Sequence, residues 1–340
     1  MRKSALKYFK CISCNETNLK FKKLTYYNNN KDEILNGFII CSACKHEVSI
    51  EYGVPNFVTF DENHLIEKQT SRHYGSSWIN SDVSGNFSKT DFWHYDELVK
   101  ISKFPKNQNG LGLEAGCGHG KDSVRLSTSN KNSHIISIDI SEGSYVTKKR
   151  LNNLNIKNIT VVRADLSNIP IKDNIIDWGY SFGVLHHMPS PELGFREISR
   201  ILKKNSKVVM YLYSDLRENP FLRLLLFPIN IFRKFTKNMP LLCLKITCYL
   251  IMPLIYLFLT IPARIIKFLG FKNFSLKIPH HHNKMMISIY GELYDRLGAQ
   301  IEFRYSINDL KLIFSKNQLK FDGNGQIPVW RGHVIWGRKK

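Results

Sequence analysis

The stretch "GLGLEAGCGHGKDSVRLSTS" (residues 110–129) constrains the fold most, because three alternating glycines separate an apolar run from a polar one. The apolar run from Leu111 to Ala115 predicts a short buried strand, and "KDSVRLSTS" predicts a helix. A strand, a tight glycine turn and a helix form the first unit of a doubly wound sheet. The sequence therefore indicates an α/β fold.

The central region repeats this alternation of strands and helices. Further strands are predicted at 133–141, 158–170, 175–188, 206–214 and 333–340. "PELGFREISRILKKN" (191–205) predicts an amphipathic helix, and the segment near 319–327 predicts the sixth strand. We expect a doubly wound, seven-stranded Rossmann-like sheet with ligands at the carboxyl ends of its strands.

The glycine spacing excludes two phosphate-binding motifs. A G-x-x-x-x-G-K-[ST] loop needs a hydroxyl residue after its lysine, whereas Asp122 follows Lys121 here. A dinucleotide fingerprint needs its third glycine three residues after the second, whereas these glycines alternate. The loop thus predicts a close backbone approach to a ligand other than a pyrophosphate.

Three acidic residues end the first three predicted strands: Glu114, Asp139 and Asp165. Carboxylates at this edge of the sheet suit a ligand that carries hydroxyl and amino groups. Asp139 and Asp165 could instead be ordinary helix caps, and Glu114 could be an exposed charge. Cys117 is interpreted as a small packing residue.

Residues 108–215 resemble class I S-adenosylmethionine-dependent methyltransferases. The motifs that carry the resemblance are "EAGCGHG", "IISIDIS", "RADLSNIP" and "FGVLHHMPSPELGFREISRILKKNSKVVMYLY", in this order. The resemblance implies an enzyme of the methyltransferase class (EC 2.1.1) and a set of cofactor-binding residues. This implied set is Glu114, Gly116, Gly118, Gly120, Asp139, Ile140, Asp165, Leu166 and Ser181.

Within that set, the resemblance gives Gly116 and Gly118 to the methionine moiety and Asp139 to the ribose hydroxyls. Asp165, with the backbone of Leu166, would hold the adenine amino group. "KQTSRHYGSSWIN" resembles the lead-in of related enzymes, where Tyr74, Gly75 and Trp78 would belong to a helix over the cofactor. An interdomain linker helix is the alternative.

Candidate catalytic residues are few, because in-line attack on a sulfonium methyl needs positioning more than acid or base. His186 and His187 follow the fourth strand and could act as a base, pack, or contact the cofactor. In the related enzymes a Tyr-Asp pair precedes the sixth strand, which implies that Tyr294 and Asp295 face the acceptor. Residues 280–282 are three consecutive histidines, which we interpret as a loop.

Two C-x-x-C pairs lie near the N-terminus: Cys11, Cys14, Cys41 and Cys44. Two such pairs give four thiolates, the closed ligand shell of a structural zinc ion, although a ribbon without metal is the alternative. "LKFKKLTYY" and residues 37–57 predict short strands around the pairs. Residues 8–60 resemble the zinc ribbons found beside methyltransferases and in tRNA methyltransferase activator subunits.

A strongly apolar segment at about 217–285 follows the fifth predicted strand. Residues 246–263 carry no charge, which reaches the length of a membrane span, but Pro253 and Pro262 interrupt them. We interpret the segment as a helical lid inserted between the fifth and sixth strands, whose apolar face covers the substrate site or lies in a membrane interface. Soluble core or dimer-forming helices and true insertion are the alternatives.

The expected domains are a ribbon (1–60), a linker with cofactor-capping helices (61–107) and a methyltransferase domain (108–340). The net charge of +21 among 340 residues favours acidic partners, although Lys, Asn and Ile are abundant throughout. Seven cysteines and no apolar leader after the basic first residues favour a reducing cytoplasm.

The expected function is S-adenosylmethionine-dependent methyl transfer to a small-molecule or lipid-linked acceptor, such as a saccharide or a quinone-type lipid. We expect structural zinc, and peripheral contact with the inner face of a membrane through 217–270. An RNA methyltransferase that uses the ribbon is the first alternative, although nucleic acid fits the apolar segment less well. A non-enzymatic, zinc-dependent interaction module is the second.

Overall fold

The computed structural model describes residues 1–27, 30–60, 64–79, 93–104, 106–217, 220–276, 278, 285–327 and 332–340. These form two compact units. The sheet unit comprises Met1–Ser214, Ile301–Ile327 and Gly332–Lys340, and the helical unit comprises Asp215–Gln300. The histidines at 280–282, part of the expected linker (80–92) and residues 328–331 lie outside the described residues.

The central strands of the sheet unit run parallel, as the alternation of strands and helices predicts. They are β5 (Gly110–Ala115), β6 (Ser133–Asp139), β7 (Ile159–Arg163), β8 (Ile176–Phe182) and β9 (Leu202–Tyr213). Strand β11 (Gly332–Lys339) pairs antiparallel with both β9 and β10 (Leu319–Ile327). The order is β7-β6-β5-β8-β9-β11-β10, so the chain reverses its winding between β5 and β8.

Helices cover both faces of this sheet, because right-handed crossovers on either side of β5 leave from opposite faces. Helices α2 (Trp93–Ser102), α3 (Lys121–Ser129) and α4 (Gly143–Asn153) contact one another in series, and α5 (Pro191–Ile201) contacts α11 (Ile307–Lys316). Five of the six residues of β5 are buried, as expected for a strand covered on both faces. This burial on both faces fixes the positions of the carboxyl ends of the strands.

One helix boundary differs from the prediction. The amphipathic run at 191–205 predicts a single helix, but α5 ends at Ile201 and the chain enters β9 at Leu202. Leu202 pairs with Ile176 of β8, and the pairing then shifts register before Trp178. Asn205, in the shifted stretch, has a left-handed φ of 65°. Sheet pairing therefore overrides the helical pattern of "LKKN".

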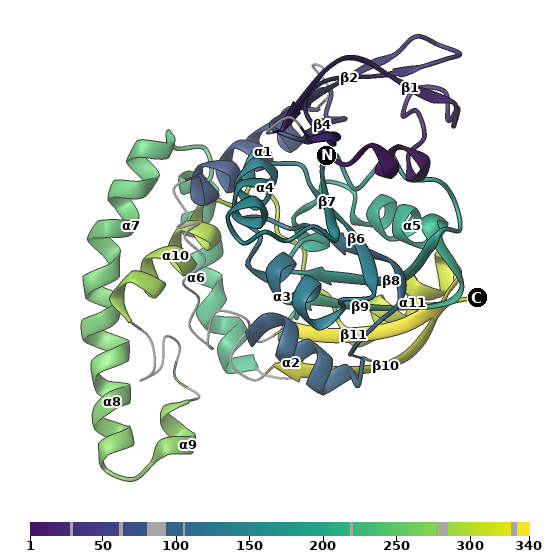
Figure 1. The fold of residues 1–340 in the computed structure, drawn as a ribbon. Helices are drawn as coiled ribbons and strands as arrows, with labels where there is room; N and C mark the ends of the chain where they lie inside the picture. The colour runs from purple at the N-terminus through teal and green to yellow at the C-terminus, as the bar shows by residue number, and fades with distance from the viewer. Residues whose placement is uncertain are drawn as a thin grey trace. The chain divides into compact units, whose positions relative to one another are not determined.

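The N-terminal segment adds four strands, so the sheet formed by the described residues has eleven strands rather than the seven expected. The added strands are β1 (Leu19–Tyr27), β2 (Asn30–Cys41), β3 (Glu47–Glu51) and β4 (Val54–Asn56), which Figure 1 shows in purple and blue. Asn56 of β4 pairs in parallel with Arg163 of β7, and the Phe57 amide donates to the Arg163 carbonyl at 2.8 Å. The seven expected strands correspond to β5–β11, because β1–β4 continue the sheet past β7.

The helical unit lies in the chain between β9 and β10. It contains α6 (Pro220–Thr236), α7 (Leu241–Ile255), a π-helical turn (Tyr256–Thr260), α8 (Ile261–Phe268), α9 (Lys272–Ser275) and α10 (Met286–Gly298). Figure 1 shows α7 and α8 as one continuous green rod. By length and composition, Leu241–Phe268 is the one helix among the described residues that could cross a membrane.

Candidate functional site

The glycine loop between β5 and α3 is closely packed. Gly116 has a φ of +85°, and a Cβ on it would lie 2.1 Å from Cγ2 of Val184. Gly120 has a φ of +83°, and a Cβ there would lie 2.8 Å from Oγ1 of Thr147. Both the left-handed backbone and the lack of space therefore require glycine at these two positions.

The Asp139 carboxylate holds this loop in place. Its Oδ2 accepts a hydrogen bond from the Gly118 amide at 2.8 Å, and its Oδ1 accepts from the amide and hydroxyl of Ser141 at 2.8 and 2.6 Å. Burial raises the pKa of Asp139, although these three donors act in the opposite direction. Since a carboxylate accepts about four hydrogen bonds, Asp139 has room for one more donor.

Glu114 is the most unusual group at this edge of the sheet. It is buried, and only its Oε2 is bonded, to the hydroxyls of Ser123 at 2.6 Å and Ser137 at 2.5 Å. Its Oε1 is buried and accepts no hydrogen bond from any described residue. Burial raises the pKa of Glu114 to about 8. A buried carboxylate oxygen without a donor fits a cationic or N–H ligand group.

The sequence pattern did not identify Ser123 and Ser137 as partners of Glu114. A signal was available, since Ser137 is a small polar residue inside the apolar strand "IISID". Its side chain is fully buried, and a buried hydroxyl needs a hydrogen-bond partner. The packing that brings the partner to it is long-range, so the sequence alone could not name Glu114.

The remaining implied cofactor residues lie at the same edge of the sheet. Oδ1 of Asp165 accepts from the Ser167 amide at 2.7 Å, as in a local turn, and Leu166 is buried. The Ile140 carbonyl accepts from Ser71 of helix α1 (Leu65–Trp78) at 3.1 Å. Ser181 is buried and donates to the Ala115 carbonyl at 3.0 Å, so its hydroxyl ties β8 to β5.

Helix α1 packs over the glycine loop. The Trp78 ring stacks on His119 with 4.4 Å between ring centroids and 7° between planes. A Cβ on Gly118 would lie 3.4 Å from Nε1 of the same tryptophan, and a Cβ on Gly75 would lie 3.5 Å from the Glu142 amide. The segment that carries Tyr74, Gly75 and Trp78 is therefore in contact with the loops after β5 and β6.

The two histidines after β8 have different surroundings. Nδ1 of His187 lies 2.8 Å from the Ile301 carbonyl, which leaves Nε2 for another partner. His186 is fully buried against Tyr213, with ring centroids 3.9 Å apart, and neither of its nitrogens is hydrogen-bonded to a described residue. Burial lowers the pKa of His186 well below its usual range, so this ring is neutral at pH 7.

Tyr294 lies in the helical unit, not in the sheet unit that contains the other candidates. Its ring is buried in a cluster with Leu244, Cys248 and Leu293. Its role toward an acceptor stays a prediction.

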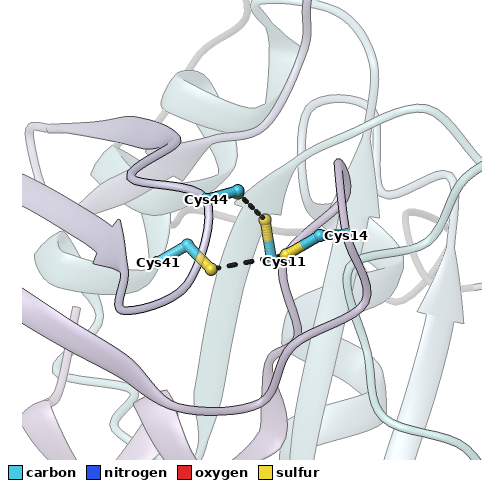
Figure 2. Close-up of side chains that lie close together, drawn as sticks. All are labelled: Cys11, Cys14, Cys41 and Cys44. Carbon is cyan, nitrogen blue, oxygen red and sulfur yellow. Dashed lines mark hydrogen bonds between the residues drawn. The ribbon is translucent and has the colours of Figure 1, made fainter.

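The four N-terminal cysteines form the candidate metal centre, which Figure 2 shows in close-up. Their sulfur atoms all lie within 4.8 Å of one another. Sγ of Cys11 is 3.6 Å from that of Cys44, and Sγ of Cys14 is 3.5 Å from that of Cys41. Sulfurs bound tetrahedrally at about 2.3 Å from zinc lie about 3.8 Å apart, so the arrangement fits this ion.

The two cysteine loops have the same backbone design. In each, the residue after the second cysteine (Asn15 or Lys45) is left-handed and donates its amide to the carbonyl of the first cysteine, at 3.0 and 3.2 Å. The amide of each first cysteine is also bonded, Cys11 to the Glu16 carbonyl and Cys41 to the His46 carbonyl. His46 thus supports the loop through its backbone, and its ring is not part of the four-sulfur cluster.

Comparison with known proteins places this site in context. Residues 113–210 match the model of a methyltransferase domain. An uncharacterized chloroplastic methyltransferase of Arabidopsis thaliana is 32% identical over 130 residues, which cover 36% of this chain and 37% of that protein. The tRNA (carboxymethyluridine(34)-5-O)-methyltransferase of Saccharomyces cerevisiae is 25% identical over 126 residues, 37% of this chain and 42% of that protein.

Among solved structures, an S-adenosylmethionine-dependent methyltransferase from Aquifex aeolicus aligns with a TM-score of 0.44 and 14% identity. The alignment covers 82% of this chain and 98% of the Aquifex aeolicus chain. The alignments with the Arabidopsis and Saccharomyces proteins span less than half the length of either protein.

The matched region and the relatives support a methyltransferase. That region contains the glycine loop and the acidic strand ends, so these residues lie in the part of the chain that is similar to methyltransferase domains.

Proposed function

We propose that the chain transfers a methyl group from S-adenosylmethionine to a small-molecule or lipid-linked acceptor. The observation that carries this proposal is the buried Oε1 of Glu114, which lacks a donor beside a loop that only glycine fits. An amino group of the cofactor would supply the missing donor. The match of residues 113–210 to a methyltransferase domain agrees with this assignment.

When bound, S-adenosylmethionine supplies a methyl group on a sulfonium, an electrophile that needs no further activation. The residues of the chain would bind and orient. Glu114 would accept from the amino group, Asp139 would use its one remaining acceptor position for a ribose hydroxyl, and Asp165 would face the adenine. Fixed positioning of this kind can supply effective molarities of about 10⁵ to 10⁸ M.

A base is optional in this scheme. His187 could take a proton from an acceptor through Nε2, since its Nδ1 already faces the Ile301 carbonyl. His186 is a poor base because its pKa is strongly lowered. We assign His186 to packing against Tyr213.

Zinc has a structural role in this proposal. The four thiolates Cys11, Cys14, Cys41 and Cys44 would fill a tetrahedral shell and leave no position for a substrate. The ion would hold together the two cysteine loops, one of which precedes β1 and the other of which follows β2.

Calorimetry tests the cofactor site directly. We expect Asp139→Asn to weaken S-adenosylmethionine binding at least tenfold, because the variant loses a charged acceptor and loosens the glycine loop. Asp322→Asn, on β10, is the matched control and should bind like the parent chain. Equal affinity of all three proteins for the cofactor would refute the site.

A labelled-methyl screen on lipid, small-molecule and RNA extracts tests the acceptor. We expect the label in the lipid or small-molecule fraction. RNA is the second candidate, because one relative is named a tRNA methyltransferase and the chain has a net charge of +21. Label in RNA alone, with salt-dependent RNA binding, would replace the proposed acceptor class and leave the cofactor site intact.

A further inference from the structure

The helical unit contains one long apolar helix that is mostly uncovered. It runs 28 residues from Leu241 to Phe268 through α7, the π-helical turn and α8, and only 17% of its most apolar window is buried. Its length is therefore about 42 Å at 1.5 Å per residue. Such a helix usually fills a protein core, where its side chains would be buried.

One stripe of this helix packs inward. Leu244 and Cys248 belong to a buried cluster with Ile289 and Leu293 of α10. Further along, Thr260 and Ala263 are fully buried. Ile251, Met252 and Ile255 also pack against the buried cluster, so the inward face extends along α7.

The opposite stripe is apolar and exposed, and we call it the docking face. Leu250 is 69% exposed and Phe258 is 67% exposed. The residues of the docking face are Leu242, Ile246, Leu250, Leu254, Phe258, Ile261, Ile265 and Phe268. An exposed apolar surface of this size marks an interaction site.

The charges around the docking face have a single sign. Residues 219–291 contain ten Lys and Arg residues and no Asp or Glu. Lys245 lies near the start of the helix, and Arg264 and Lys267 lie near its end. A long apolar face flanked only by cations complements a surface that is apolar within and anionic at its boundary.

We propose that the docking face binds an anionic lipid bilayer, with Leu241–Phe268 lying in the plane of the membrane interface. The apolar side chains enter the acyl boundary, and the flanking cations contact lipid phosphates. This inference is independent of the proposed methyl transfer, because it uses no residue of the glycine loop.

The packing of α10 argues against a span. Helix α10 lies against the inward stripe of α7 and carries Glu292, Asp295 and Arg296. A spanning α7 would carry these charged side chains toward the hydrocarbon, which is costly. A helix parallel to the membrane keeps α10 on the aqueous side.

The same charges argue against a second copy of the chain as the occupant. Two copies joined through their docking faces would bring cations against cations with no acidic partner between 219 and 291 on either side. Like-charge contacts of this kind oppose association. The anionic bilayer is the partner that uses both the apolar face and its cationic flanks.

Flotation of the full chain with vesicles tests the proposal. We expect the protein to float with phosphatidylcholine vesicles that contain phosphatidylglycerol, and to float weakly with phosphatidylcholine alone. Alkaline carbonate should release it, as expected for an interfacial helix. Retention after carbonate would show a span and overturn the proposed orientation.

Two pairs of variants assign the binding to the docking face. Leu250→Ser with Phe258→Ser should lower vesicle partition at least tenfold, while Leu312→Ser with Tyr52→Ser, also exposed, should leave it unchanged. Arg264→Glu with Lys267→Glu should lower partition onto anionic vesicles at least roughly 25-fold, since each cation contributes about fivefold. Lys20→Glu with Lys204→Glu is the charge-matched control.

Other occupants predict different results. Concentration-dependent dimers that the Leu250 and Phe258 changes dissociate, without vesicle binding, would assign the face to a second copy. RNA binding that the Arg264 and Lys267 changes abolish, without vesicle binding, would assign it to nucleic acid. Either result overturns the proposal. Cofactor binding by the same variants is measured in parallel, so failure here is distinct from failure of the methyltransferase site.

Discussion

The sheet unit and the helical unit differ in where their polar and apolar side chains lie. At the carboxyl ends of the strands, buried polar groups are hydrogen-bonded to one another. Glu114 accepts from Ser123 and Ser137, and Asp139 accepts from the Gly118 amide of the glycine loop. In the helical unit, large apolar side chains such as Leu250 and Phe258 are exposed. These polar groups of the first unit are therefore paired within the chain, whereas the second unit leaves large apolar side chains exposed.

Loss of the proposed zinc ion gives the largest expected effect on the sheet unit. Cys14→Ala with Cys44→Ala removes one ligand from each loop at exposed positions, so little packing is lost. We expect loss of bound zinc and a fall in the free energy of unfolding of several kcal/mol, because structural zinc contributes folding energy on the order of 10 kcal/mol in small domains. Metal analysis and denaturant titration measure both.

Cys243→Ala is the control for this variant, since Cys243 is exposed on α7 and lies outside the cluster. It should keep its zinc and its stability. Unchanged stability of the zinc-free double variant would show that the ribbon is held by its strands alone.

Two leucines on α7 separate the inward stripe from the docking face. Leu244→Ala should lower the free energy of unfolding by about 2–5 kcal/mol, because Leu244 is 2% exposed and its loss leaves a cavity. Leu250→Ala should change it by less than about 0.5 kcal/mol. Denaturant titration without lipid makes the comparison, and similar losses for both would mean that the docking face is buried in solution.

Glu114 gives the sheet unit a specific pH dependence. Its folded pKa of about 8 lies above the ordinary glutamate value of 4.5, so the folded state binds more protons between these pH values. Stability should fall as pH rises from about 4.5 to 8, with a slope of at most about 1.4 kcal/mol per pH unit from this group. Glu114→Gln should flatten that slope in denaturant titrations.

The same variant tests the proposed ligand of Glu114. The charged carboxylate is the form that would accept from an amino group, so S-adenosylmethionine should bind more tightly as pH rises toward 8. Glu114→Gln should weaken binding by roughly tenfold or more and remove this pH dependence. A glutamine variant with unchanged affinity at every pH would assign Glu114 to the loop alone.

Two glycines of one loop should differ in their tolerance of a side chain. Gly116→Ala places a Cβ 2.1 Å from Val184 at a φ of +85°, whereas Gly118→Ala meets Trp78 at 3.4 Å with a φ of +50°. We expect a loss of about 1–3 kcal/mol for Gly116→Ala and about 1 kcal/mol for Gly118→Ala. Val184→Ala should restore part of the first loss, and thermal unfolding ranks the four proteins.

The sequence predicted well what depends on local pattern. Helix α3 begins at Lys121 and ends at Ser129, as "KDSVRLSTS" predicts, because glycines precede it and the strand before it is mostly apolar. The two cysteine pairs likewise predicted the four-sulfur cluster. In both cases the signal lies within a few neighbouring residues.

Features that depend on distant pairing were not predictable in this way. No local signal joins Asn56 to Arg163, and none shows that Oε1 of Glu114 lacks a donor while Oε2 has two. The end of α5 at Ile201 was also missed, because the strand that draws Leu202 into the sheet lies elsewhere in the chain. Such features follow from tertiary packing, which a pattern of residue types does not encode.

The pairing of β4 with β7 has a consequence for how the protein is made. Ribosomes synthesise the ribbon first, and roughly 100 further residues must follow before β7 exists, which takes roughly 5–20 s at cellular rates. During that interval β4 is an unprotected strand edge, the kind of surface that pairs with other chains. Early capture of zinc by the nascent ribbon would hold this edge in a defined shape until its partner strand emerges.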